Sequence, residues 1–351
     1  MSISIKSKSR NLNERGHRSL IVKFKVPRLL PKSFTSVGAL LLALILIFLL
    51  FSRLVSGGHF ASPGNIELIL IQSVIVLLTA LGSAYVIISG GIDLSVGSAT
   101  ACSSVTVAVA IVNWHFSLPL AFAVGVVTGG LWGLLNGLLV TKLQVGPFIA
   151  TLSTYLIVRA AARGIAHDSA VSGPDNNSWL NNLATSSGTH TWQLLPWGVW
   201  ITIGLAILMG ICLKYTRFGR YTVAVGSNEN AAKLCGVPVN RVKLSVYILS
   251  GLFAGLAGVM LYSQLIEGDP TSAKGLELQA IAAVVIGGAS LSGGEGSIAG
   301  AMIGALIMQT IETGSAQMGL PDWVQKVVTG VIILIAVGFD RFRAKRSNPT
   351  G

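Results

Sequence analysis

Residues 66–98 read IELILIQSVIVLLTALGSAYVIISGGIDLSVGS. The apolar run 66–88 is long enough to cross the hydrocarbon core of a bilayer as a helix. Gly90 and Gly91 then interrupt the helical pattern, and Asp93 follows in apolar surroundings. Such backbone is tolerated at membrane depth only where protein buries it or water lines it. We therefore expect an all-α integral membrane protein with a helix break near residues 89–98.

The composition of the chain agrees with a membrane environment. Its 351 residues are 52% hydrophobic and 11% charged, and the mean hydropathy is +0.72. A soluble domain carries about 25% charged residues. Apolar segments that could span a membrane fall at about ten places: 34–54, 66–88, 95–113, 117–140, 147–163, 196–213, 244–262, 276–290, 297–313 and 323–340. The sequence therefore predicts about ten transmembrane helices and leaves little chain for a soluble domain.

The placement of charge predicts the orientation. The net charge is +12, and nine Lys or Arg lie in 1–33 and four in 341–351. Taken together, the stretches 1–33, 141–146, 213–243 and 341–351 hold twenty Lys or Arg, whereas the loops expected on the other side hold only Lys274. Positive charge is retained on the cytoplasmic side. We expect both termini in the cytoplasm, and the charge pattern argues against nucleic-acid binding.

The same pattern divides the chain into three parts. Residues 1–33 form a basic cytoplasmic extension, 34–340 the membrane domain, and 341–351 a basic cytoplasmic tail. The first apolar segment follows a long basic lead without a convincing cleavage site, so we interpret it as a retained span rather than a signal peptide. Three cysteines without C-x-x-C spacing predict neither a disulfide framework nor a metal site.

An acid inside a membrane segment is costly and by default suggests function. Asp93 could contact the solute or act in gating. It could instead cap a helix starting near Leu94 by accepting the Ser95 or Val96 N–H. Both roles are compatible, so they stay open. We therefore take as candidate translocation-pathway residues Gln72, Gly90, Gly91, Asp93, Ser95 and Asn136. Gln72 and Asn136 could equally make hydrogen bonds between helices.

A related break recurs at 287–297 and hints at an internal repeat. It contains Leu-Ser-Gly-Gly-Glu, which looks like the signature of ABC ATPases. The chain has no Gly-x-x-x-x-Gly-Lys-Ser/Thr motif and so no phosphate cradle. We interpret the match as coincidence and expect no ATPase activity, no catalytic residues and no cofactor in this chain.

Other patterns have a structural and a functional interpretation. Glycines recur every four residues at 125, 129, 133 and 137 and at 296, 300 and 304, which predicts close helix contact. Arg159 and Arg163 could snorkel to the membrane interface or line a polar vestibule. The polar loop 164–195 could be a connector or a docking surface for an external partner.

The cytoplasmic stretch 214–243 predicts a short helix over 228–235, capped by Ser227, ended by Gly236 and stopped by Pro238. Such a helix could dock into a groove on a partner protein, with Ala231 and Ala232 against the partner. The alternative is a solvated linker. The candidate docking residues are Asn228, Glu229, Asn230, Ala231, Ala232, Lys233, Leu234 and Gly236.

Four ordered motifs carry a resemblance: 89–98, Gly-Pro-Phe-Ile-Ala-Thr-Leu at 146–152, the loop 217–243, and 283–297. Together they resemble the ribose/xylose/arabinose-type permeases of bacterial ABC importers, over about residues 35 to 340. The resemblance implies a second permease subunit, identical or different, two cytosolic ATPase domains, and a periplasmic or lipid-tethered sugar-binding protein. It also implies that 228–236 is the coupling helix and that 89–98 belongs to the central pathway.

The sequence and this resemblance thus predict a bacterial plasma-membrane permease subunit that imports a monosaccharide, a pentose, with energy from partner ATPases. A secondary transporter with Asp93 as a proton or ion coupling site is the alternative. A purely structural membrane scaffold is a third class, which would show no solute dependence. Relatives of this fold also transport nucleosides or a signalling furanone, so the resemblance does not identify the solute.

Overall fold

The computed structural model describes residues 32–55, 58–175, 178–185 and 195–347. Most of the predicted N-terminal extension, part of the loop 164–195 and the last four residues lie outside these ranges. Each of the ten apolar segments coincides with one helix: α1 (Lys32–Leu54), α2 (Pro63–Ile88), α3 (Val96–Val112), α4 (Leu118–Thr141), α5 (Pro147–Ile165), α6 (Trp197–Tyr215), α9 (Val239–Leu265), α10 (Leu276–Ile286), α11 (Ile298–Gln317) and α12 (Asp322–Ser347).

Short elements connect these helices. They are the 3-10 turn η1 (His59–Ala61), the helices α7 (Arg217–Ser227) and α8 (Glu229–Leu234), and the strands β1 (Val171–Ser172) and β2 (Glu267–Gly268). The two strands pair antiparallel, with Val171 opposite Gly268. With strands of only two residues each, the all-α prediction is confirmed in substance.

Helix lengths separate full spans from partial ones. Among the described residues, six helices are long and apolar enough to cross a membrane: α1, α2, α4, α5, α6 and α9. The apolar helices α3 and α10 have 17 and 11 residues. At 1.5 Å per residue they extend about 25 Å and 17 Å, less than the roughly 30 Å of hydrocarbon. Both of these partial helices adjoin a predicted break.

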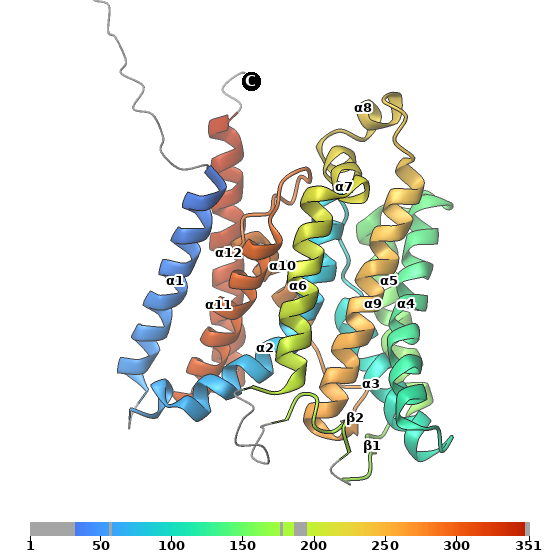
Figure 1. Cartoon of the computed structure of the whole chain (residues 1–351), viewed down its shortest axis with the longest axis vertical. Coiled ribbons are helices and arrows are strands. Elements are labelled where there is room, and N and C mark those ends of the chain that lie inside the picture. The colour runs from blue at the N-terminus through green and yellow to red at the C-terminus, as the bar shows by residue number, and fades with distance from the viewer. Residues whose placement is uncertain (1–31, 56–57, 176–177, 186–194, 348–351) are drawn as a thin grey trace, which may run out of the picture.

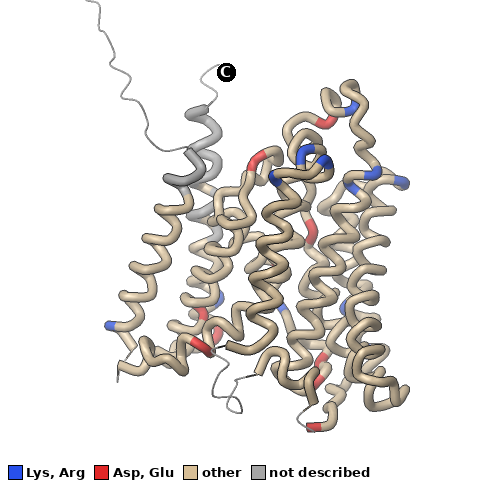
Figure 2. The backbone as a smooth tube through the Cα atoms, in the orientation of Figure 1, with Lys and Arg blue, Asp and Glu red and all other residues tan. Residues whose placement is uncertain are grey.

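The helices form one bundle with two distinct ends (Figure 1). The connecting helices α7 and α8 lie at one end, which we call the α7–α8 end, and β1 and β2 lie at the opposite one, the β1–β2 end. The first residues of α1 and the last turn of α12 also lie at the α7–α8 end. Lys and Arg gather there as well (Figure 2). This arrangement fits the predicted charge asymmetry.

The centre of the bundle is α9, which packs against α2, α3 and α4. Close approach of α4 and α9 depends on missing side chains. A β-carbon on Gly129 would lie 2.3 Å from the Gly251 carbonyl oxygen, and one on Gly133 would lie 2.3 Å from that of Tyr247. Backbones can touch in this way only where neither helix carries a side chain. The prediction from the four-residue glycine repeat is confirmed.

By contrast, α1 stands at the edge of the bundle (Figure 1). Only 6% of its apolar window is buried inside the chain. It is held by Phe51, whose ring lies 5.7 Å from that of Phe60 in η1 and packs on Gly314 of α11. Its leucine-rich exposed face is therefore suited to contact lipid.

Candidate functional site

The first break follows directly from its two glycines. α2 ends at Ile88, and Gly90 adopts φ +80°, a left-handed conformation that favours glycine. Gly91 needs space rather than an unusual angle, because a β-carbon there would lie 2.8 Å from the Tyr247 hydroxyl oxygen. The chain then runs without regular structure until α3 begins at Val96. The predicted break is confirmed, and α3 begins two residues after the expected Leu94.

The Asp93 side chain is buried in this break, and both of its carboxylate oxygens accept hydrogen bonds. Its Oδ1 accepts from the Ser95 backbone N–H at 3.0 Å and from the Ser95 hydroxyl at 2.7 Å. Its Oδ2 accepts from the Ser250 hydroxyl of α9 at 2.9 Å. The predicted bond to the Ser95 N–H is confirmed. The carboxylate thus ties the start of α3 to the central helix.

Ser95 extends the network to two further helices. Its hydroxyl oxygen accepts from the Asn136 side-chain amide of α4 at 2.7 Å. The Asn136 carbonyl oxygen in turn accepts from the Thr154 hydroxyl of α5 at 2.6 Å. Asn136 therefore makes the interhelical hydrogen bonds that were one of its two predicted roles. The Asp93–Ser95–Asn136–Thr154 chain, with Ser250, is called the Asp93 network below.

The backbone of the break is also held from both sides. The Ile92 carbonyl oxygen accepts from the Thr151 hydroxyl of α5 and the Tyr247 hydroxyl of α9, each at 3.3 Å. Exposed fractions are 3% for Asp93, 2% for Ser95 and 1% for Asn136. In this conformation these groups are occupied by protein partners and shielded from solvent. Their place along the translocation pathway stays a prediction.

Gln72 lies in a different polar cluster. It is 18 residues before Gly90, which is about 27 Å along a helix. Its Oε1 accepts from the Gln309 amide at 3.2 Å and the Thr313 hydroxyl at 3.0 Å, both on α11. Gln72 therefore makes interhelical hydrogen bonds, one of its two predicted roles, apart from the Asp93 network, and its place along the translocation pathway stays a prediction. Our sequence reasoning missed the partners on α11, although Gln309, Thr313 and Gln317 recur every four residues and so share one helix face.

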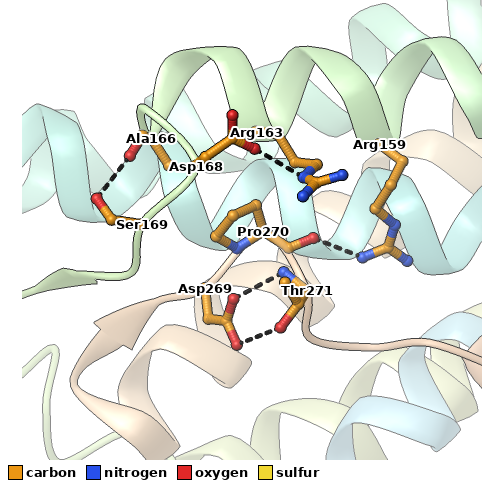
Figure 3. Close-up of polar contacts among 8 residues, drawn as sticks. All are labelled: Arg159, Arg163, Ala166, Asp168, Ser169, Asp269, Pro270 and Thr271. Atoms are coloured by element: carbon orange, nitrogen blue, oxygen red, sulfur yellow. Dashed lines mark hydrogen bonds and ion pairs between the residues drawn. The ribbon is translucent and has the colours of Figure 1, made fainter.

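Arg159 and Arg163 of α5 have separate roles (Figure 3). Arg159 Nη1 donates to the backbone carbonyls of Pro270 at 2.9 Å and Ser272 at 2.6 Å, so it anchors the segment before α10. Arg163 pairs with Asp168 at 2.8 Å, and both side chains are more than half exposed. The snorkelling interpretation fits Arg163 but not Arg159, whose side chain is directed into the protein.

The connection between α6 and α9 forms two helices rather than one. α7 begins with the Thr216 hydroxyl accepting the Gly219 N–H at 3.2 Å. Asn228 separates it from α8 and caps α8, because its side-chain oxygen accepts the Ala231 N–H at 2.9 Å. The predicted cap at Ser227 is wrong: Ser227 ends α7, and its hydroxyl bonds to the Val223 carbonyl. Gly236, with φ +81°, follows α8 as expected.

The predicted coupling residues on and around α8 differ in exposure: one is buried and the others are exposed. Ala232 is 5% exposed and packs inside the chain, so the expectation that it faces a partner is corrected. Leu234 is 89% exposed, and the remaining predicted positions are also exposed. Glu229 is held by Lys243 of α9 through an ion pair of 2.6 Å. An apolar side chain on a short capped helix is the kind of anchor that helix-in-groove docking uses.

These features define a multi-pass membrane protein with a non-helical break between α2 and α3 and an exposed connection, α7 and α8, at one end. Residues 65–337 match the family described as branched-chain amino acid transport system / permease component. Because the match covers more than half of the chain, this protein belongs to that family. The family match begins inside α2, so it leaves out α1.

Curated relatives narrow the comparison. The chain is 39% identical over 268 residues to the L-arabinose transport system permease protein AraH of Escherichia coli K12, covering 76% of this chain and 80% of the relative. It is 41% identical over 283 residues to the ribose import permease protein RbsC of Bacillus subtilis 168, covering 80% and 86%. No solved structure matches the chain. The predicted resemblance to ribose and arabinose permeases is confirmed.

Proposed function

We propose that this chain is the permease subunit of an ATP-binding-cassette importer for a pentose in a bacterial plasma membrane. The observation that carries the proposal is the similarity to relatives named for L-arabinose and ribose, at 39% and 41% identity over at least 76% of the chain. The family description names branched-chain amino acids instead. The two solute classes differ in charge and hydroxyl content, so uptake assays separate them.

Deletion of the gene in the native host tests the solute. We expect uptake of labelled L-arabinose or D-ribose to fall and to be restored by the full chain. Uptake of labelled L-leucine should not change. If L-leucine uptake alone falls, the solute class is that of the family description and the pentose assignment is wrong.

Energy supplied by partner ATPases is supported by the exposed helix α8. Leu234, at 89% exposure, would insert into a groove on the ATPase, and truncating or charging such an anchor commonly costs a few kcal/mol. Two ATPase domains, a second permease subunit at the membrane and a sugar-binding protein at the β1–β2 end complete the proposed assembly. The chain itself converts ATPase closure into alternating access.

Introducing a negative charge at Leu234 tests this contact. In Leu234→Glu we expect normal membrane levels, but loss of both pentose uptake and ATPase co-purification. Leu143→Glu is the matched control, since Leu143 is 68% exposed and lies just after α4. If Leu234→Glu recovers the ATPase at the wild-type level, α8 is not the coupling element.

A proton- or ion-coupled transporter using Asp93 is less well supported, because both carboxylate oxygens already accept bonds from the protein. The two mechanisms differ in how uptake responds to loss of the proton gradient and to loss of ATP. Collapse of the proton gradient in ATP-replete cells should leave pentose uptake intact, whereas ATP depletion should abolish it. The opposite pattern would favour the secondary transporter.

The proposed orientation places the α7–α8 end in the cytoplasm. Native Cys235 is exposed and directly follows α8, and Ser172 is exposed in β1. An impermeant thiol reagent applied to intact spheroplasts should label Ser172→Cys and leave Cys235 unlabelled. Labelling of Cys235 alone would invert the orientation.

A further inference from the structure

The two breaks and the end of α7 meet at one point. The Gly294 N–H donates to the Ile88 carbonyl at 2.9 Å, so the second break is hydrogen-bonded directly to the end of α2. Gly226 of α7 lies against both partners of this bond, and Gly293 lies against Gly90. We call this contact of residues 88–90, 226 and 293–294 the glycine junction.

The junction has no room for a side chain at Gly226 or Gly293. A β-carbon on Gly226 would lie 1.9 Å from the Ile88 carbonyl oxygen and 2.6 Å from the Gly294 nitrogen. One on Gly293 would lie 2.8 Å from both Gly90 Cα and the Gly226 carbonyl oxygen. Three segments distant in sequence therefore touch through their backbones. Contacts of this kind transmit displacement, because no flexible side chain lies between the moving parts.

The junction is joined closely to the proposed coupling helix. Gly226 is two residues before Asn228, the cap of α8. α7 is fixed to α2 about two turns before Gly226, where the rings of Phe218 and Tyr85 stack at 5.8 Å. On the other side, α8 is held to α9 by the Glu229–Lys243 pair, in which Glu229 is about half exposed. Such an exposed pair adds little to the four-residue chain connection, 235–238, that already joins α8 to α9.

We propose that the glycine junction moves both breaks together when α7 and α8 are displaced. The inference rests on the proposed coupling role of α8. In this arrangement a push on α8 shifts Gly226, and Gly226 displaces residues 88–94 and 287–297 at the same time. Because α3 and α10 begin or end at these breaks, both partial helices respond to one input.

A single methyl group tests the junction. Gly226→Ala should reach the membrane at the wild-type level and still co-purify the ATPase, since α8 is unchanged. Pentose uptake should fall by about tenfold or more, equivalent to roughly 1.4 kcal/mol on the transport barrier. Gly210→Ala in α6 is the control, because its nearest neighbouring atom would lie 3.9 Å from the new carbon. Wild-type uptake by Gly226→Ala would overturn the proposal.

Hydrogen–deuterium exchange on the wild-type complex decides the matter if Gly226→Ala does not accumulate. The complex purified with its ATPase is compared without nucleotide and with ATP and vanadate. Peptides covering 86–95, 217–234 and 287–297 should change their exchange together. A change confined to 217–234 would refute the junction while leaving α8 docking intact. Failure of the wild-type chain to recover any ATPase would instead refute the proposed function.

Discussion

Replacing Asp93 separates its hydrogen bonds from its charge. Asp93→Ala removes three bonds and leaves the Ser95 N–H without its acceptor in a buried site. Bonds to a charged group contribute about 1.5–3 kcal/mol each, and Ser250 can find another acceptor, so we expect a net loss of about 3–5 kcal/mol. Asp93→Asn keeps an oxygen for Ser95 and presents an N–H to the Ser250 hydroxyl. Its expected loss is about 1 kcal/mol.

Thermal unfolding of the purified chain in detergent, followed by size-exclusion chromatography, measures this difference. For a chain of this size, each kcal/mol of lost stability lowers the melting temperature by about 2 °C. The Ala variant should therefore melt about 5–10 °C lower than the wild type, and the Asn variant about 2 °C lower. Equal losses in the two variants would refute the hydrogen-bond argument. A loss below 1 kcal/mol in both would show that the Asp93 network does not hold the break.

Transport by the Asn variant reports on the charge alone. The carboxylate lies at the start of α3, where a negative charge is favoured by the helix dipole and the amide is not. We expect Asp93→Asn to fold but to import labelled pentose more slowly. Import at the wild-type rate would leave Asp93 with a structural role only.

Two further pairs of variants test packing. Arg159→Gln should lose about 2–4 kcal/mol of stability, because two carbonyls before α10 lose their donor, whereas Arg163→Gln should change it by about 0.5 kcal/mol or less. Similar melting temperatures for both would contradict the anchoring role. Gly129→Val should cost about 3 kcal/mol or more by separating α4 from α9. Gly204→Val, with open space around its β-carbon, is the control, and a matching loss there would implicate helix propensity instead.

Much of the fold could be predicted because the membrane imposes it. Each long apolar run gives a helix, since backbone groups in lipid have no other partner. The break at Gly90 and Gly91 and the α4 glycine face also have local sequence signals. Ser250 has none: it lies 157 residues from Asp93, and the register of α9 against α2 depends on packing that no local pattern encodes.

The connection between α6 and α9 shows a second limit. The polar sequence of 217–227 suggested a loop, yet it folds as α7. Its buried residues Gly219, Thr222 and Val225 recur every three positions, a short helical pattern that is visible once the partner surface is known. Hydrogen-bond capacity alone also could not choose between Ser227 and Asn228 as the cap, since both side chains can accept the required N–H.

The polar interior of α3 has a consequence for biosynthesis. Fifteen of its 17 residues are buried, including Ser98, Thr100 and Ser103, and it packs most extensively on α9. α9 is synthesised only after α4 to α8. Until then α3, which has only 17 residues and carries several Ser and Thr side chains, lacks the helix on which it packs most extensively. The packing of α3 is therefore completed late in biosynthesis, and nascent chains truncated before α9 should be substrates for membrane quality-control proteases.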